Sequence, residues 1–473
     1  MEKRELNRKF RKYVLSSMIT MFLESAYSLV DGVFVSNFVG GSALAAINVA
    51  WPIIAVVTAL GTGCGCGGAV LMSIHQGAGD QEQSNEVRAD TILLLLVTGM
   101  LSTVLFQIFL KQALILMGCS GSLLNLAVLY GRFMIGGSIV QILSCGLAPL
   151  LRNDNKAVSA MAIMVSGFGL HILLDYVLLH FFGLGVAGAA LSSVTAQAFT
   201  TICCFIILLT KKDNPLRPVQ FRLIPRKSGS ETQQTGTEKV IRWERWLQII
   251  RTGISPFGIS LTPSFLILWH NMACLSTGNE GIVTAYALIT STVGSYRMLL
   301  IGVAEGMQPL ASYAYGEKNS KDMFRIRNMS ITLAYIVSIA LFLLTMGTAQ
   351  FYPALYGYTD SSLEEVCVHA IRWTAPQLIF TGMVRVSNSY FYAVGKNLYS
   401  LLMIYLDPLV LTPLMLTILM HLIGTDGIWL NADVTQLMLN VLAVWMFVRH
   451  EREVKNYENY GTAGKNCPAG SAC

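Results

Sequence analysis

Twelve stretches of mainly apolar residues run through this chain, separated for the most part by short polar segments. A helix that spans a bilayer needs about 20 such residues, and each stretch is long enough to supply one. No stretch shows the strict alternation of a barrel strand. The sequence therefore predicts an all-α polytopic membrane protein with twelve transmembrane helices. They lie approximately at 13–36, 45–75, 90–112, 122–150, 158–181, 186–210, 246–275, 281–313, 329–352, 364–393, 398–423 and 427–449.

Composition and charge agree with this class. Hydrophobic residues make up 53% of the chain and charged residues only 13%, far from the balance of a soluble domain. Most of the 33 Lys and Arg residues lie in the N-terminus, in loops after even-numbered helices and in the C-terminal tail, whereas Lys111 lies in a loop on the other side. Basic residues mark the cytoplasmic side, so both termini are expected to be cytoplasmic. The net charge of +6 then reflects membrane orientation, and no nucleic-acid partner is expected.

The chain is expected to consist of two similar halves. A long polar segment at 211–245 separates the first six stretches from the last six. SIHQGAGDQEQSNEVR (73–88) also aligns without a gap with SYAYGEKNSKDMFRIR (312–327), after the second and the eighth stretch respectively. The predicted parts are a cytoplasmic N-terminus (1–12), an N-terminal bundle (13–210), a cytoplasmic linker (211–245), a C-terminal bundle (246–450) and a cytoplasmic tail (451–473).

Six is an even number, so both halves begin and end on the same side of the membrane. A pseudo-twofold axis along the membrane normal would relate the two six-helix bundles. A central cleft between like-oriented bundles can open to either side, which is the usual construction of an alternating-access carrier.

Acidic residues inside the apolar stretches are the strongest functional signal, because an intramembrane charge is costly and needs a partner or a task. Glu24, Ser28 and Asp31 lie on one face of the first helix, and His171 and Asp175 are one turn apart on the fifth. If these faces meet, the carboxyl groups, imidazole and hydroxyl can hold a proton or a small cation. The alternative is that Asp31 reaches the membrane interface and Asp175 is a structural hydrogen-bonding group.

The charged residues in the apolar stretches of the second half do not lie on one helical face as those of the first half do. Glu305 and Asp407 are weaker candidates for contact with substrate or ion, and Arg297, Arg372 and Arg385 are its intramembrane guanidinium groups. Eight cysteines lie in or next to helices without metal-ligand spacing and are interpreted as packing residues, whereas Cys467 and Cys473 lie in the tail.

Four segments in order resemble the multidrug and toxic compound extrusion (MATE) family, and the resemblance covers essentially the whole membrane region. They are SLVDGVFVSNFVGGSALAA (28–46), LLRNDNKAVSAMAI (150–163), LLDYVLLHFFGLGVAGAALSS (173–193) and GMQPLASYAYGEKN (306–319). The resemblance implies an exporter driven by inward movement of H⁺ or Na⁺. It also implies an ion site at Asp31 and Asp175, with His171 in place of the family's amide residue and a hydroxyl at Ser193.

His171 departs from that family pattern. Na⁺ is a hard cation that prefers oxygen ligands, so imidazole favours proton coupling and leaves Na⁺ at Asp31 and Asp175 as the second option. The expected function is therefore a monomeric, cofactor-free antiporter of the bacterial inner membrane that exports organic, cationic and amphipathic compounds, as in multidrug efflux.

Two alternatives remain open at this point. One is a flippase for lipid-linked saccharides, which would need basic residues in the cleft to hold pyrophosphate. The more remote one is an intramembrane aspartyl protease, suggested by the Gly-x-Gly-Asp match at 77–80. Because Asp80 opens a polar loop that the repeat mirrors, no enzymatic activity is expected.

Overall fold

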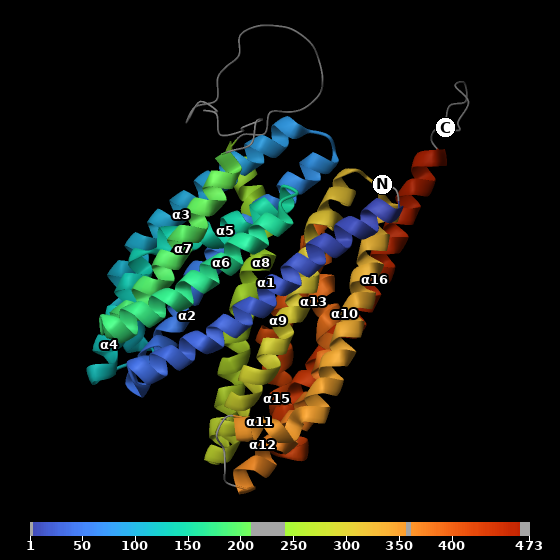
Figure 1. The fold of residues 1–473 in the computed structure, drawn as a ribbon. Helices are drawn as coiled ribbons and strands as arrows, with labels where there is room; N and C mark the ends of the chain where they lie inside the picture. Colours follow the sequence, from blue (N-terminus) through green and yellow to red (C-terminus); the bar gives the residue numbers. More distant parts are fainter. Residues whose placement is uncertain (1–2, 210–241, 356–360, 464–473) are drawn as a thin grey trace, which may run out of the picture.

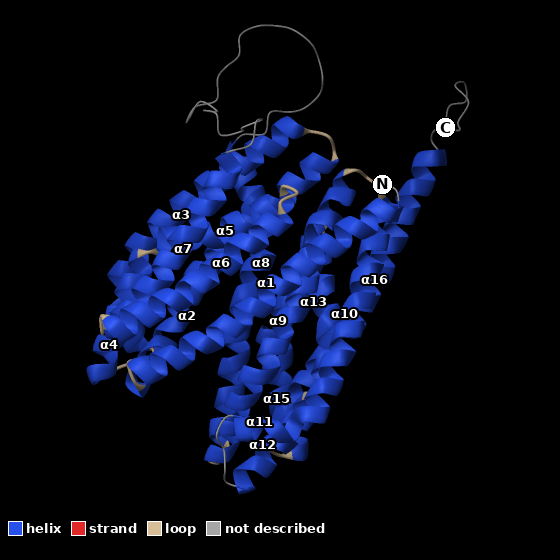
Figure 2. Cartoon of the chain, viewed as in Figure 1, coloured by secondary structure: helices blue, strands red, loops and turns tan. Residues whose placement is uncertain are grey.

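The molecule is built from helices throughout its described part. A computed structural model describes residues 3–209, 242–355 and 361–463, and these contain no strand (Figure 2). The predicted linker and the tail cysteines Cys467 and Cys473 lie largely or wholly outside these ranges.

The N-terminal half contains seven α-helices and one π-helix, which correspond to the first six predicted spans. They are α1 (Lys3–Phe38), α2 (Gly41–Gly77), α3 (Gln81–Leu116), α4 (Gly121–Gly136), α5 (Ser138–Asn153), α6 (Ala157–Asp175), the π-helix η1 (Tyr176–Phe181) and α7 (Gly185–Leu209).

The C-terminal half supplies the other six spans, several of them in pieces. Its helices are α8 (Arg242–Ser276), α9 (Glu280–Gly316), α10 (Ser320–Thr348), the 3₁₀ helix η2 (Ala349–Phe351), α11 (Tyr352–Leu355), α12 (Ser361–Thr374), α13 (Gln377–Ala393), α14 (Asn397–Leu406), the π-helix η3 (Asp407–Leu411), α15 (Thr412–Ile423) and α16 (Asp426–Ala463).

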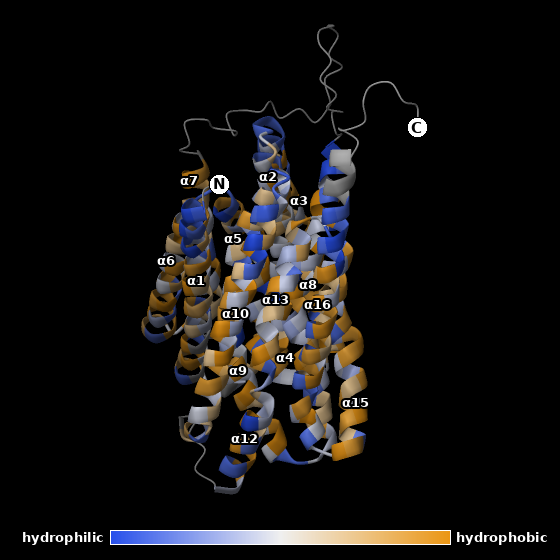
Figure 3. Ribbon diagram, turned by 90° about the vertical axis from the view of Figure 1, so that its right-hand side faces the viewer, coloured by the Kyte–Doolittle hydropathy of each residue, from blue (hydrophilic) through white to orange (hydrophobic). Residues whose placement is uncertain are grey.

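The membrane-spanning character of these helices is clear from length and composition. Among the described residues, ten helical spans are long and apolar enough to cross a membrane, and the bent pair α4 and α5 makes eleven. The remaining predicted span, the tenth at 364–393, is formed by α12 and α13, which are separated at Ala375 and Pro376. Hydrophobic residues follow the helices along their length, whereas hydrophilic residues gather where α2 and α16 end (Figure 3).

The span predicted at 122–150 is not a single straight helix. It bends by 56° between α4 and α5, at Gly137. A Cβ atom at Gly137 would lie 2.6 Å from the side chain of Val194 on α7, so the missing side chain permits close approach at the bend.

The two halves form two bundles, and the first helix of each half also packs against the second span of the other half. α2 packs against α8, and α9 packs in the same way against α1, as a pseudo-twofold relation requires. In Figure 1, α1 crosses from the N-terminal bundle to lie along α9, and the bundles diverge away from the end at which α1 begins and α16 finishes. The predicted two-bundle architecture of twelve spans is confirmed.

The aligned segments 73–88 and 312–327 have equivalent structures. Asp80 and Asn319 each cap the following helix by accepting a hydrogen bond from a backbone N–H group. Eight residues further on, Arg88 forms an ion pair with Asp154 at 2.9 Å and Arg327 forms one with Glu451 at 3.0 Å. Asp80 is therefore a helix cap within the repeat.

The bundles are held together at the end that carries both described chain ends. Gly67 lies so close to α8 that an added Cβ would stand 2.2 Å from the carbonyl oxygen of Ile249. Arg152 of α5 and Glu305 of α9 form an ion pair of 2.6 Å between the bundles. Asn153 donates a hydrogen bond to Gln308 in the same layer. We call this set of contacts the closed layer.

Candidate functional site

The structure brings the predicted acidic residues of α1 and α6 together. One ligand atom each from Asp31, His171 and Asp175 lies within 4.8 Å of the others. Ser193 joins them from α7, because its Oγ atom lies 2.8 Å from Nε2 of His171. We call Asp31, His171, Asp175 and Ser193 the ion cluster. Three helices of the N-terminal bundle therefore contribute to it.

Asp175 is the most buried member of the ion cluster, with none of its surface exposed. Its Oδ1 atom accepts a hydrogen bond from Ser192. Its Oδ2 atom is buried and accepts no hydrogen bond from any described residue, and Nε2 of His171 lies 3.7 Å away. A buried carboxylate oxygen that accepts no hydrogen bond is costly, and such a position can hold a proton or a small cation.

A change of helical type occurs at Asp175. α6 ends there, and the next residues form the π-helix η1, in which the N–H of Phe182 bonds to the carbonyl of Val177. Such π-helical turns insert one residue into a helix and are frequent at functional sites. Gly183 follows with a φ of 58°, which favours glycine. Asp175 thus lies at a break in the fifth span.

Aromatic residues enclose one side of the ion cluster. Tyr27 of α1 stacks on Phe168 of α6 with ring centroids 4.7 Å apart. The same tyrosine meets the ring of His171 edge to face at 5.4 Å. These contacts fix the imidazole and couple α1 to α6 beside the acids.

The remaining predicted candidates lie elsewhere. Glu24 is half-buried on α1 and is not among the groups within 4.8 Å of one another. Glu305 is the ion-pair partner of Arg152 in the closed layer. Asp407 lies in the C-terminal bundle, at the start of η3, and accepts hydrogen bonds from Thr412 at 2.9 Å and Gln436 at 2.8 Å. The side chain of Ser28 is outside the described part.

Ser192 is a site residue that the sequence did not single out. Two adjacent serines begin the polar part of α7, and their side chains meet different partners, Asp175 for Ser192 and His171 for Ser193. The sequence signal that could have indicated Ser192 is its position directly before Ser193.

A pocket between the bundles adjoins the closed layer. It has a volume of about 430 Å³ and is lined by Thr62 and Cys66 of α2 together with residues of α8, α9 and α13, including Glu305 and Arg385. Both halves therefore contribute to the lining of this pocket.

The fold and these two features define a polytopic helical membrane carrier with two like-oriented bundles. A family model described as MatE matches residues 16–177 and 264–416, so the chain belongs to the MATE family of multidrug efflux transporters. It is accordingly a multi-pass membrane transporter of small molecules and not an enzyme.

Individual proteins of this kind are similar over nearly the whole chain. The multidrug export protein MepA of Staphylococcus aureus (strain MRSA252) is 25% identical over 431 residues, which cover 90% of each protein. A solved structure described as the outward-facing conformation of a multidrug resistance MATE family transporter has a TM-score of 0.86 at 22% identity, covering 95% of this chain and 97% of that one. A structure of a MATE protein in a bent conformation has a TM-score of 0.84 at 22% identity, covering 96% and 97%.

Proposed function

We propose that this protein is a secondary antiporter that exports organic, cationic and amphipathic compounds in exchange for protons, with Na⁺ as the second option for the coupling ion. Family membership supports transport, and the similarity to multidrug export proteins favours multidrug efflux. We place it in the bacterial inner membrane as a monomer, and its basic residues suggest that both termini are cytoplasmic.

The partnerless Oδ2 atom of Asp175 carries the proposal for ion binding. It is buried inside a cluster that also holds Asp31 and His171, so an occupant with positive charge would relieve its desolvation. A single proton or a small cation fits this role.

The hydrogen bonds of Ser193 favour a proton. Its hydroxyl group donates to the carbonyl oxygen of Ala189 at 3.1 Å, and a hydroxyl has only one hydrogen to donate. In the tautomer with hydrogen on Nε2, His171 would donate to the same Oγ, 2.8 Å away, and both groups would be satisfied. A protonated nitrogen offers no lone pair to Na⁺, which leaves fewer ligands for that ion.

Coupling would act through α1. This helix carries Asp31 and packs against both α6 and α9, so a change in the ion cluster can move it relative to both bundles. With cytoplasmic termini, the closed layer lies on the cytoplasmic side, and the described conformation corresponds to one open to the outside. Proton binding would favour opening of the closed layer.

The surroundings of Arg385 disfavour a flippase for lipid-linked saccharides. A pyrophosphate group needs a concentration of positive charge. In the pocket between the bundles, Arg385 shares the space with the carboxylate of Glu305. Glu305 is in turn paired with Arg152, so a single basic lining residue, Arg385, would have to hold a pyrophosphate.

Transport in proteoliposomes tests the proposal. Purified protein is reconstituted, a pH or a Na⁺ gradient is imposed, and movement of ethidium is followed by fluorescence, with protein-free liposomes as the control. We expect the pH gradient to drive ethidium against its concentration gradient. Transport of a lipid-linked saccharide without ethidium transport would contradict the proposal in favour of a flippase.

A further inference from the structure

The first turns of α1 carry basic side chains that no acid of the described chain engages. Four exposed residues supply this charge: Arg4, Arg8, Arg11 and Lys12. Their side chains form no hydrogen bond or ion pair with any residue in the described ranges. Glu5, the acid of the first turn, is paired with Lys9 at 3.0 Å. The start of α1 therefore presents positive charge without an acidic partner in this part of the chain.

The first helix of the other half begins in different surroundings. Arg245 of α8 is held by two acids of α3, by Asp90 at 2.7 Å and by Glu86. In the gapless alignment of the two halves, Glu86 corresponds to Arg325 of α10. Arg325 lies beside α1, because it donates a hydrogen bond to Asn7 at 3.2 Å. The start of α1 thus meets an arginine where the start of α8 meets acids.

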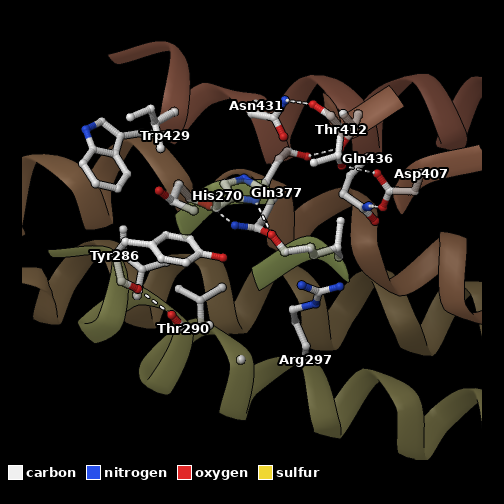
Figure 4. A pocket seen from close by; sticks show the side chains of 18 residues that line it. His270, Tyr286, Thr290, Arg297, Gln377, Asp407, Thr412, Trp429, Asn431 and Gln436 are labelled. Carbon is white, nitrogen blue, oxygen red and sulfur yellow. Dashed lines mark hydrogen bonds between the residues drawn. The ribbon is translucent and has the colours of Figure 1, made fainter. Parts of the chain in front are cut away.

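Arginines inside the molecule also have a carboxylate nearby. Arg152 forms its ion pair with Glu305 in the closed layer. Arg297 lines a pocket of the C-terminal bundle together with Asp407 (Figure 4). The basic side chains at the start of α1 differ from both, so an anion that neutralises them would come from outside the described chain.

The exposed face of α1 changes from basic to apolar along the helix. One helical face collects six exposed residues at intervals of three or four: Arg4, Arg8, Arg11, Leu15, Ile19 and Phe22. We call these six residues, with Lys12 beside them, the outer stripe of α1. Phe22 lies ten residues after Lys12, which is about 15 Å of helix. This length matches one leaflet of a hydrocarbon core of about 30 Å.

The outer stripe lies on the side of α1 opposite the ion cluster. Successive residues of an α-helix are rotated by about 100°, so two residues that are two positions apart lie on nearly opposite faces. Asp31, which belongs to the ion cluster, lies two positions before Val33, and Val33 is 56% exposed. Glu24 likewise lies two positions after Phe22, which is 54% exposed. The apolar part of the outer stripe therefore faces the surroundings of the protein, where acyl chains can contact it.

We propose that the outer stripe of α1 binds an anionic phospholipid. The lipid phosphate would contact the guanidinium groups of Arg8 and Arg11 and the ammonium group of Lys12, because guanidinium groups bind phosphate oxygens through paired N–H bonds and each basic residue near the membrane surface attracts anionic lipid. One acyl chain would lie along the apolar part of the stripe. The basic and apolar parts are continuous, so a lipid uses the whole stripe and a free phosphate only its start. The inference does not depend on the proposed antiport.

Native mass spectrometry of the full-length protein tests this site. The detergent-solubilised protein is titrated with phosphatidylglycerol, which is anionic, or with phosphatidylcholine of the same acyl chains, which has no net charge. A third titration uses glycerophosphoglycerol, the anionic headgroup without acyl chains. Comparison of the three separates recognition of a lipid from recognition of a phosphate group alone.

Two triple variants locate the site. The stripe variant removes three charges from α1: Arg8→Gln, Arg11→Gln and Lys12→Gln. The surface control removes three charges from exposed positions on α8, α10 and α16: Arg251→Gln, Lys321→Gln and Arg452→Gln. A further variant, Arg8→Lys with Arg11→Lys, keeps the charge of the stripe.

We expect wild type to bind phosphatidylglycerol about tenfold more tightly than phosphatidylcholine, which corresponds to about 1.4 kcal/mol, and to bind the headgroup alone more weakly than either lipid. The stripe variant should bind both lipids equally, and its binding of phosphatidylcholine shows that it is folded. The surface control should keep the preference, and the lysine variant most of it. No preference in wild type, an equal loss in both triple variants, or equally tight binding of the headgroup alone would overturn the inference.

Discussion

Asp175 and Asp407 lie at equivalent places in the two halves of the chain. Each belongs to the fifth span of its half, and a π-helical segment begins at or directly after it. Each also accepts a hydrogen bond from the sixth span, Asp175 from Ser192 and Asp407 from Gln436. The surroundings differ, because Asp175 lies beside a second acid whereas Asp407 shares its pocket with Arg297.

Replacing His171 by Gln should change the ion that drives transport. The amide oxygen of Gln adds a hard ligand beside Asp31 and Asp175, whereas the proton-accepting imidazole is lost. We expect weaker efflux under a pH gradient and new stimulation by a Na⁺ gradient in proteoliposomes. His369→Gln is the control, since this histidine is exposed on α12. Unchanged pH-driven efflux without any effect of Na⁺ would show that His171 does not select the ion.

Breaking the ion pair of Arg152 and Glu305 should favour opening of the closed layer. Its two charged atoms are 2.6 Å apart and partly buried. If the closed state loses about 1 kcal/mol of stability, the equilibrium between the closed and the open state shifts roughly fivefold toward the open state. In an Arg152→Gln variant, we expect correspondingly faster maleimide labelling of Cys66, which lines the pocket between the bundles, from the side of the termini.

That labelling experiment uses a protein in which Cys66 is the only reactive cysteine. Charge exchange, Arg152→Glu with Glu305→Arg, should restore slow labelling because the pair can form again. Slow labelling in the single variant would mean that the ion pair does not hold the layer closed.

A side chain at Gly67 should prevent the close packing of α2 on α8. In a Gly67→Ala variant, the new Cβ would stand 2.2 Å from the carbonyl oxygen of Ile249, so the helices must separate. Overpacking of this kind costs about 1–3 kcal/mol. We expect a lower thermal midpoint and reduced efflux. Gly347→Ala on α10 is the control, because an added Cβ there meets nothing within 4 Å, and equal behaviour of the two variants would contradict the packing argument.

Much of the fold could be predicted because the length of each apolar stretch indicates a membrane span and the distribution of basic residues indicates its orientation. The repeat containing Gly77 and Gly316 also appears in the structure as equivalent helix ends, where each glycine contacts the backbone of the other bundle. The bend at Gly137 could not be predicted, since it depends on the approach of Val194 from α7, which is distant in sequence.

The ion cluster was only partly predictable for a similar reason. The spacing of His171 and Asp175 places them on one helical face, and the structure brings Asp31 to that face. The sequence does not tell which of the two serines bonds to which partner. The surroundings of Arg297 are formed by spans that are distant in sequence. The sequence alone therefore cannot show that its guanidinium group lines a pocket of the C-terminal bundle.

The central claim is that Asp175 carries the coupling ion. The most direct measurement compares pH-driven ethidium efflux by proteoliposomes that contain wild type, Asp175→Asn or, as the matched control, Asp426→Asn, which alters a partly exposed acid near the start of α16. We predict that Asp175→Asn binds ethidium normally but transports it no faster than protein-free liposomes do, whereas Asp426→Asn behaves like wild type. Wild-type rates of pH-driven efflux by Asp175→Asn would contradict the account.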